Sequence, residues 1–105
     1  MIELTTTGAR TGREHRITLG ALDIDGRLVV VASAMGSPKH PAWYHNLRQN
    51  PLVAVETGTE TFEATAVLPP DRDALFAEIV AREPGFAAYQ ARTSRLLPVV
   101  ELRRT

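Results

Sequence analysis

The sequence predicts a mainly β, α+β fold: a small barrel of about six short antiparallel strands with two to three inserted helices. Short apolar runs alternate with turn residues along most of the chain, which is typical of barrel strands. Turns at Asp25-Gly26 and around Gly58 predict hairpins. No GxGxxG motif follows a strand, so a parallel dinucleotide-binding unit is not expected. A chain of 105 residues has the length of one domain, which we place at residues 1–105.

Three strands are predicted in the first third of the chain. A threonine-rich strand in residues 3–12 runs into a glycine-bounded turn, and residues 15–24 read as a second strand. The Asp25-Gly26 turn leads to residues 28–33, whose continuous apolar run predicts a buried strand.

The middle of the chain predicts a short helix followed by a hairpin. Pro41 suits the first turn of a helix over residues 42–49, and Pro51 ends it. Residues 52–57 and 61–68 predict the hairpin around Gly58, and the alternation in its second strand predicts one solvated face.

The last third predicts a longer helix and a final strand. Asp71 is a plausible N-cap for a helix over residues 71–83, whose apolar positions form one stripe of Leu75, Phe76, Ile79 and Val80. Residues 86–95 read as a shorter helical or irregular segment, and residues 96–102 as the last strand.

Composition limits the function classes. Hydrophobic residues make up 44% of the chain, which predicts a packed core. The absence of cysteine excludes disulfides, thiolate metal sites and a cysteine nucleophile, and it fits a reducing cytoplasm. The net charge is zero, which does not suit non-specific nucleic-acid binding, but residues 1–48 carry six basic and four acidic side chains. This half suits a small anionic ligand. No signal peptide or long apolar span is seen, so we expect at most peripheral membrane association.

Residues 33–51 carry the strongest local signal. Gly36 permits close backbone approach, and Lys39 is the only lysine in a chain with eleven arginines. The N-terminus of the helix after Pro41 offers amide donors to a phosphate or carboxylate, and Trp43 offers a ring to a planar ligand. An equally weighted reading is a proline-bounded loop and helix with Trp43 in the core.

The loop of the first hairpin is a second candidate. Arg10, Arg13 and Arg16 lie with Thr11 in a glycine-bounded turn, where they could clamp a polyanionic tail. The alternative reading of this segment is a solvated basic turn.

The sequence shows no pattern that indicates a metal site or a serine hydrolase. His40 and His45 are five residues apart, which is not the spacing of a helical metal pair, and no carboxylate lies between them in metalloprotease fashion. Ser33 and Ser37 lack the setting of a hydrolase nucleophile. A planar anionic cofactor in an apolar barrel, with the cofactor performing the redox step, remains as the best reading.

Three segments resemble the deazaflavin-dependent nitroreductase family: residues 4–22, residues 29–56 and residues 86–102. The run G-x-P-K-x-P-x-W-Y-x-N-L-x-x-N-P, beginning at Gly36, is the most specific part of the resemblance. The resemblance implies an FMN-binding split-barrel-like fold, coenzyme F-420 as cofactor, and hydride transfer to a small conjugated acceptor such as a quinone, enone or nitro compound.

The resemblance also implies the site residues. The cofactor groove would be formed by Arg10, Thr11, His15, Thr18 and Leu19 on one side and by Ser33, Lys39, Pro41, Ala42 and Trp43 on the other. No catalytic side chain is implied, and Ser33 and Tyr89 would face the acceptor. Ala34 stands where many members carry a polar residue. Members that reduce nitro-drugs carry tyrosines at the positions of Gly20, Glu83 and Phe86, so small acceptors are expected here.

Two rival functions remain at this stage. One is a related split-barrel flavoprotein that uses FMN, and the other is a non-catalytic protein that carries or sequesters the cofactor. For the assembly, both a monomer and a homodimer are open.

Overall fold

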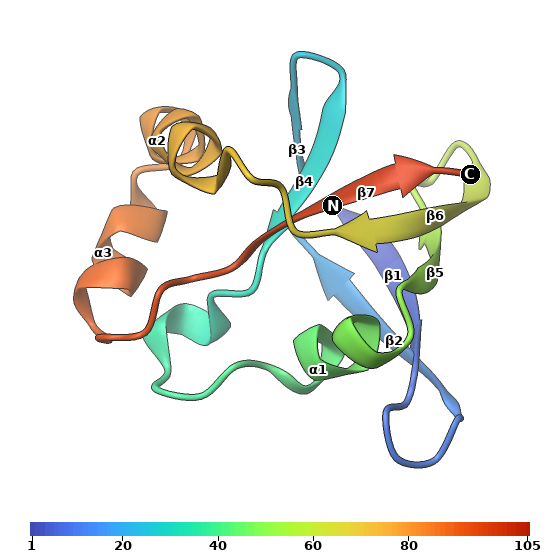
Figure 1. Cartoon of the computed structure of the whole chain (residues 1–105). Helices are drawn as coiled ribbons and strands as arrows, with labels where there is room; N and C mark the ends of the chain where they lie inside the picture. The colour runs from blue at the N-terminus through green and yellow to red at the C-terminus, as the bar shows by residue number, and fades with distance from the viewer.

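The computed structural model describes residues 1–105 and contains seven strands: β1 (Ile2–Thr7), β2 (Glu14–Leu19), β3 (Leu22–Ile24), β4 (Arg27–Val31), β5 (Leu52–Glu56), β6 (Thr61–Val67) and β7 (Val99–Arg104). They pair antiparallel throughout, in the spatial order β2-β1-β5-β6-β7-β4-β3. The sheet curls into a half-barrel whose two edges are β2 and β3 (Figure 1).

Three α-helices and one 3₁₀ turn complete the fold: α1 (Ala42–Gln49), α2 (Arg72–Arg82), α3 (Gly85–Ala91) and η1 (Ala34–Gly36). Figure 1 shows α1 below the barrel and α2 and α3 together at its side. None of these helices has the length and apolar character needed to cross a membrane.

The expected fold class is confirmed, with one more strand than the sequence reading counted. The segment 15–24 is not one strand, because it divides at Gly20 into β2 and β3. These two strands pair with β1 and β4, which lie far apart in the sheet, so one continuous strand cannot serve both. The turn after β3 is a hairpin turn as predicted, with φ of 53° at Asp25 and 81° at Gly26.

The start of α2 also needs a correction. Asp71 precedes the helix as expected, but its side chain makes no capping hydrogen bond. Its carboxylate instead accepts two hydrogen bonds from Arg27, at 2.7 and 3.0 Å. The predicted apolar stripe is confirmed: Leu75 and Ile79 are buried and the other two positions are half-buried.

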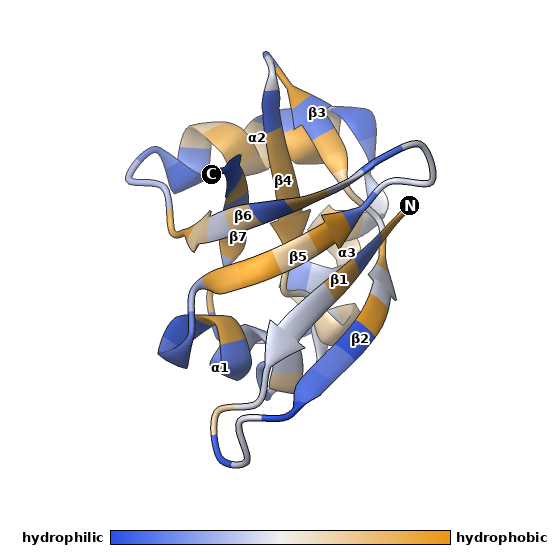
Figure 2. Ribbon diagram, turned by 90° about the vertical axis from the view of Figure 1, so that its right-hand side faces the viewer, coloured by the Kyte–Doolittle hydropathy of each residue, from blue (hydrophilic) through white to orange (hydrophobic).

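Two apolar clusters lie on opposite faces of the sheet. The larger fills the barrel interior, where Trp43, Tyr44 and Leu47 of α1 pack against β1, β5 and β7. The smaller lies where α2 covers the outer face of β3, β4 and β7 with Leu75 and Ile79. Figure 2 shows the apolar colour concentrated on β4 and β5, whereas β2 is polar over most of its length.

Candidate functional site

A cavity of about 670 Å³ opens between the β1–β2 hairpin and the beginning of α1. Its walls come from two segments that are some thirty residues apart in the chain. The lining residues are Gly8, Ala9, Arg10, Thr11, His15, Arg16 and Ile17 from the hairpin, and Pro41, Ala42, Trp43, His45 and Asn46 from α1 and its approach.

The core-facing side of β2 forms the apolar part of this wall. In the register of the sheet, Ile17 of β2 pairs with the fully buried Leu4 of β1, so both side chains point to the barrel side. Yet Ile17 is 37% exposed, because α1 packs mainly over β1 and a cavity opens between α1 and β2. An apolar surface that should be covered in a finished core is therefore left open.

The hairpin loop holds its shape through its own backbone. The Gly8 amide donates to the Arg13 carbonyl at 2.7 Å, and the Gly12 amide donates to the Gly8 carbonyl at 3.0 Å. A Cβ atom at Gly8 would lie 2.8 Å from Nε2 of His15, so the close approach of this ring requires glycine.

Asn46 joins the loop to α1. Its Oδ1 accepts the Ala9 amide at 3.0 Å, and its Nδ2 donates to the Thr6 hydroxyl at 3.2 Å. Asn46 and Thr6 are both buried. A buried amide with both ends bonded fixes the distance between the two walls of the cavity.

Trp43 serves the core and the cavity together. It is 6% exposed, belongs to the barrel cluster and also lines the cavity. The helix begins after Pro41 as the sequence predicts, with Pro41 in an extended conformation at the N-cap. The reading of Trp43 as a core residue is therefore confirmed, and the reading of its ring as a contact for a planar ligand stays a prediction that its place in the cavity wall supports.

The loop before α1 is held from the far end of the chain. Ser33 and Lys39 lie on this loop and do not line the cavity. Arg95 donates from Nη1 to Nδ1 of His40 at 3.0 Å. Partial burial, together with the nearby Arg95 charge, lowers the pKa of His40, which keeps the imidazole neutral and able to accept this bond.

Six of the ten predicted cofactor residues line the cavity together: Arg10, Thr11, His15, Pro41, Ala42 and Trp43. Ser33, Lys39, Thr18 and Leu19 lie outside its walls. The Thr18 side chain points to the other face of β2, because its neighbours Ile17 and Leu19 pair with buried residues of β1. Tyr89 lies on α3, where its ring meets Phe86 edge-on at 5.8 Å.

Sequence reasoning missed Gly8, Ala9, Ile17, His45 and Asn46 as lining residues. Two of these carried a usable signal. The alternation His15, Ile17, Leu19 marks one face of a strand, and Asn46 falls one helical turn after Trp43 on the same face.

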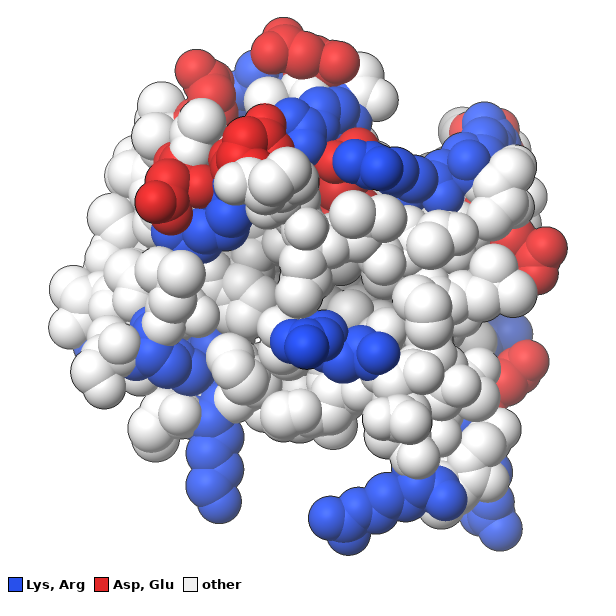
Figure 3. All heavy atoms as spheres, in the orientation of Figure 1, with Lys and Arg blue, Asp and Glu red and all other residues white.

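Charge divides the molecule into two parts. Residues 27–55 contain no carboxylate side chain, and neither Arg10, Arg13 nor Lys39 forms an ion pair. Figure 3 shows only basic side chains at the lower end of the molecule, around the hairpin loop and α1, and mixed charges above. The cavity end therefore presents a positive potential to an anion.

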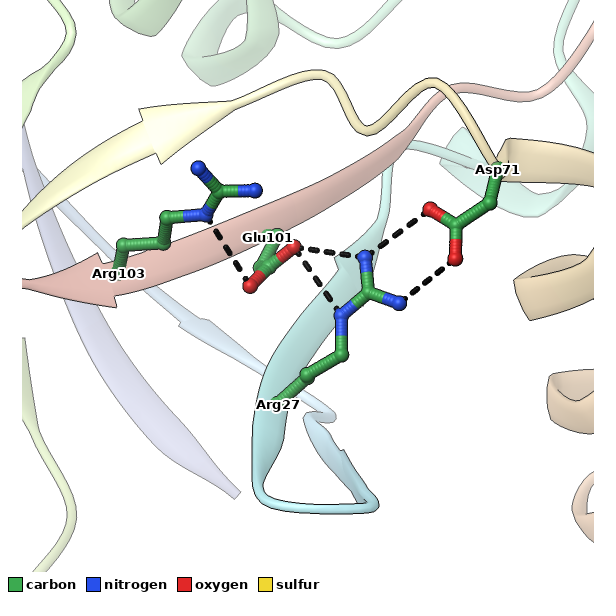
Figure 4. A network of polar contacts seen from close by, with 4 residues as sticks. All are labelled: Arg27, Asp71, Glu101 and Arg103. Atoms are coloured by element: carbon green, nitrogen blue, oxygen red, sulfur yellow. Dashed lines mark hydrogen bonds and ion pairs between the residues drawn. The ribbon is translucent and has the colours of Figure 1, made fainter.

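At the other end of the molecule, basic and acidic side chains form ion pairs with one another (Figure 4). Besides its bonds to Asp71, Arg27 donates to Glu101 at 2.8 and 3.2 Å, and Arg103 donates to the same carboxylate at 3.3 Å. Hydrogen bonds from Arg27 hold the pKa of Asp71 and of Glu101 below their ordinary values.

The residues around the cavity fit a deazaflavin. Ile17 and Trp43 both line the cavity and provide apolar surface for a flat ring system, and Arg10, which lines it too and has no ion-pair partner, is free for an anionic tail.

Comparison with known proteins agrees with this fit. Residues 1–103 match the family described as F420H(2)-dependent quinone reductase, F420H(2) being reduced coenzyme F-420. An F420H(2)-dependent quinone reductase of Mycobacterium tuberculosis is 41% identical over 106 residues, covering 96% of this chain and 71% of the relative.

Solved structures give the same result. The structure of an F420-H2 dependent reductase, FDR-A, superposes with a TM-score of 0.83 at 35% identity, covering 97% of this chain and 92% of that one. A structure described as a domain-swapped dimer has a TM-score of 0.84 at 35% identity, covering 97% and 78%. The heme storage protein HutZ of Vibrio cholerae, with a TM-score of 0.67 at 20% identity, shares the fold. The family match over nearly the whole length confirms the resemblance seen in the sequence: the chain belongs to the F420H(2)-dependent quinone reductase family, whose members are oxidoreductases that take hydride from reduced coenzyme F-420.

Proposed function

We propose that this chain reduces a small quinone with reduced coenzyme F-420 held in the cavity between the β1–β2 hairpin and α1. The observation that carries the proposal is the uncovered core-facing side of β2, where Ile17 stays 37% exposed in the same cavity that Trp43 lines. Apolar surface left open beside a buried aromatic residue suits a flat conjugated ring.

The residues of the chain bind the cofactor and orient its ring system. Ile17, Ala42 and Trp43 exclude water from the faces of the ring system. Arg10 of the hairpin loop and the first amides of α1 bind the anionic tail, with Lys39 just before α1 in the chain, whereas Arg16 of β2 is ion-paired with Glu3. Hydride transfer to the quinone is the chemistry that the reduced deazaflavin supplies when bound.

The acceptor side is proposed at Ser33 and Tyr89. Both belong to the region where η1 and α3 meet, since the Tyr89 carbonyl lies against Gly36. Phe86 packs on Tyr89 and stands where the resemblance gives nitro-drug-reducing members a tyrosine, which favours a small quinone over a bulky nitroimidazole.

A fluorescence titration with oxidised coenzyme F-420 and, separately, with FMN tests the cofactor. We expect clear preference for the deazaflavin, and comparable affinities would support the FMN flavoprotein instead. A single-turnover assay with a soluble quinone then separates an enzyme from a carrier, because a carrier binds without accelerating oxidation of the reduced cofactor.

A matched pair of variants locates the site. Ile17→Trp fills the slot and should abolish deazaflavin binding, whereas Leu52→Trp places the same ring at another exposed strand position, 53% exposed and outside the cavity. Equal binding by both variants would remove the cavity as the cofactor site.

The cellular setting is part of the proposal. A chain without cysteine suits the reducing cytoplasm, where we place it. Both a monomer and a homodimer are compatible with the fold, and analytical ultracentrifugation of the apoprotein and of the cofactor complex separates them.

A further inference from the structure

One arginine of the segment between α3 and β7 reaches across the molecule to the loop before α1. The guanidinium of Arg95 donates to the carbonyls of Ala32 at 3.1 Å, Ser33 at 2.8 Å and Ser37 at 2.8 Å. It also donates to Nδ1 of His40 at 3.0 Å. Arg95 is half-buried and has no carboxylate partner, so its hydrogen-bonding capacity is directed at this loop.

The loop that Arg95 holds contains a strained turn. Three successive residues are left-handed, with φ of 44° at Ala34, 54° at Met35 and 81° at Gly36. Residues with a Cβ atom rarely adopt this region, and such conformations persist where the surroundings impose them. Arg95 bonds carbonyls on both sides of the turn, at Ser33 and at Ser37.

The end of α3 and the residue after it pack closely against this turn. A Cβ atom on Gly36 would lie 2.7 Å from the Tyr89 carbonyl oxygen and 2.8 Å from Cβ of Arg92. Arg92 adds one long bond, 3.3 Å, to the Met35 carbonyl. The C-terminal helical region thus determines the course of the chain before α1.

This course sets the wall of the cavity. Ser37 and His40, both bonded to Arg95, bracket the pair Pro38-Lys39, and the next residue is Pro41, which lines the cavity. Two prolines in four residues leave this stretch few conformations. When its two ends are held, the position of Lys39 and the start of α1 are held as well.

We infer that Arg95 is a positioning residue of the cofactor site, which fixes Lys39 and the N-terminus of α1 without contacting the cofactor itself. The inference rests on the proposed function for the identity of the ligand. The hydrogen bonds from Arg95 to the loop are present in the chain alone, so their effect on the loop can be measured without a ligand.

The experiment compares Arg95→Gln and Arg95→Lys with Arg82→Gln. The control also removes an arginine that donates to a distant backbone carbonyl, that of Asp23 at 2.7 Å, but on the α2 side of the molecule. Amide hydrogen exchange of the apoprotein reports on the turn, since the Gly36 and Ser37 amides donate within it at 2.9 and 3.0 Å. Titration with oxidised coenzyme F-420 reports on the site.

In Arg95→Gln we expect faster exchange at Gly36 and Ser37, unchanged exchange in β5, and a dissociation constant raised about ten- to a hundredfold. Arg95→Lys should show the same changes, because a compact ammonium group cannot reach three carbonyls and an imidazole in one plane. Arg82→Gln should show neither change.

Normal exchange in the turn together with normal affinity in Arg95→Gln would overturn the inference. If Arg95→Gln does not fold, Arg95→Lys decides, since it retains the charge and the aliphatic stem, and wild-type behaviour of that variant would also overturn it. Failure of the wild type to bind the deazaflavin would count against the proposed function, while the exchange data would still decide whether Arg95 holds the turn.

Discussion

The helices cover the two edges of the sheet to different extents. At the β3 edge, α2 covers the outer face with Leu75 and Ile79, and Arg82 bonds the backbone of Asp23. At the β2 edge, α1 packs mainly over β1, and the core-facing side of Ile17 opens into the cavity. One edge is closed by the chain's own residues, and the other leaves the space that we assign to a ligand.

The charges follow the same division. Arg27 beside the β3 edge is matched by Asp71 and Glu101, whereas Arg10 and Lys39 near the open edge have no carboxylate partner; Arg16 of β2, paired with Glu3, is the exception there. Matched charges serve the fold, and unmatched basic groups beside an apolar slot remain free to bind an anion. Changes at the closed edge should therefore alter stability, and changes at the open edge should alter binding.

The largest effect is expected from Trp43→Ala, because Trp43 belongs to both the barrel core and the cavity wall. Truncation should cost about 3–5 kcal/mol of unfolding free energy and should also abolish detectable cofactor binding. Denaturant unfolding and a deazaflavin titration measure the two losses. Leu102→Ala is the control, since Leu102 is buried in the same cluster without lining the cavity. A Trp43 variant that loses stability but binds the cofactor normally would show that Trp43 belongs to the core and does not contact the cofactor.

A smaller effect, confined to stability, is expected from Glu101→Gln. Glu101 is 7% exposed and accepts hydrogen bonds from Arg27 and Arg103. Loss of its charge should cost about 1–3 kcal/mol at neutral pH, with cofactor affinity unchanged.

The same variant has a defined pH dependence. The pKa of Glu101 lies below its ordinary value of 4.5 in the folded state, so the carboxylate stabilises the fold above that pH and this contribution is lost as the pH falls. Wild type should lose stability below about pH 4.5, and Glu101→Gln should lose less over the same range. Chemical denaturation from about pH 3 to about pH 7 checks this. Weakened cofactor binding by Glu101→Gln would show that the two edges are coupled.

The smallest effect on the fold, and a clear one on binding, is expected from the unmatched cations. Lys39→Ala should raise the dissociation constant for coenzyme F-420 about ten- to a hundredfold with an unchanged unfolding midpoint. Arg104→Ala is the matched control, because Arg104 is ion-paired with Glu60 at 2.9 Å.

Salt extends this test to the hairpin loop. A neutral chain attracts an anion only through local groups within a Debye length, about 8 Å at physiological ionic strength. Joint replacement of Arg10 and Arg13 by Gln should therefore flatten the salt dependence of binding. An unchanged salt dependence would make the loop the solvated basic turn of the alternative reading.

Much of the fold could be predicted because its signals are local. The hairpin at Asp25-Gly26, the helix bounded by Pro41 and Pro51, and the apolar stripe of α2 all depend on residues close in the chain. The division of residues 15–24 into two strands could not be predicted, because it depends on where β1 and β4 lie in the sheet.

The candidate site divides in the same way. Short motifs single out the basic hairpin loop and the Trp43 helix, since glycine, proline and charge patterns act over a few residues, and the family resemblance joins the two as walls of one groove. The tertiary structure alone decides that Ile17 is uncovered, that Asn46 ties the walls together and that Arg95 holds the loop before α1. These contacts join residues 37 to 63 positions apart, and such pairings follow from the closure of the barrel rather than from any local preference.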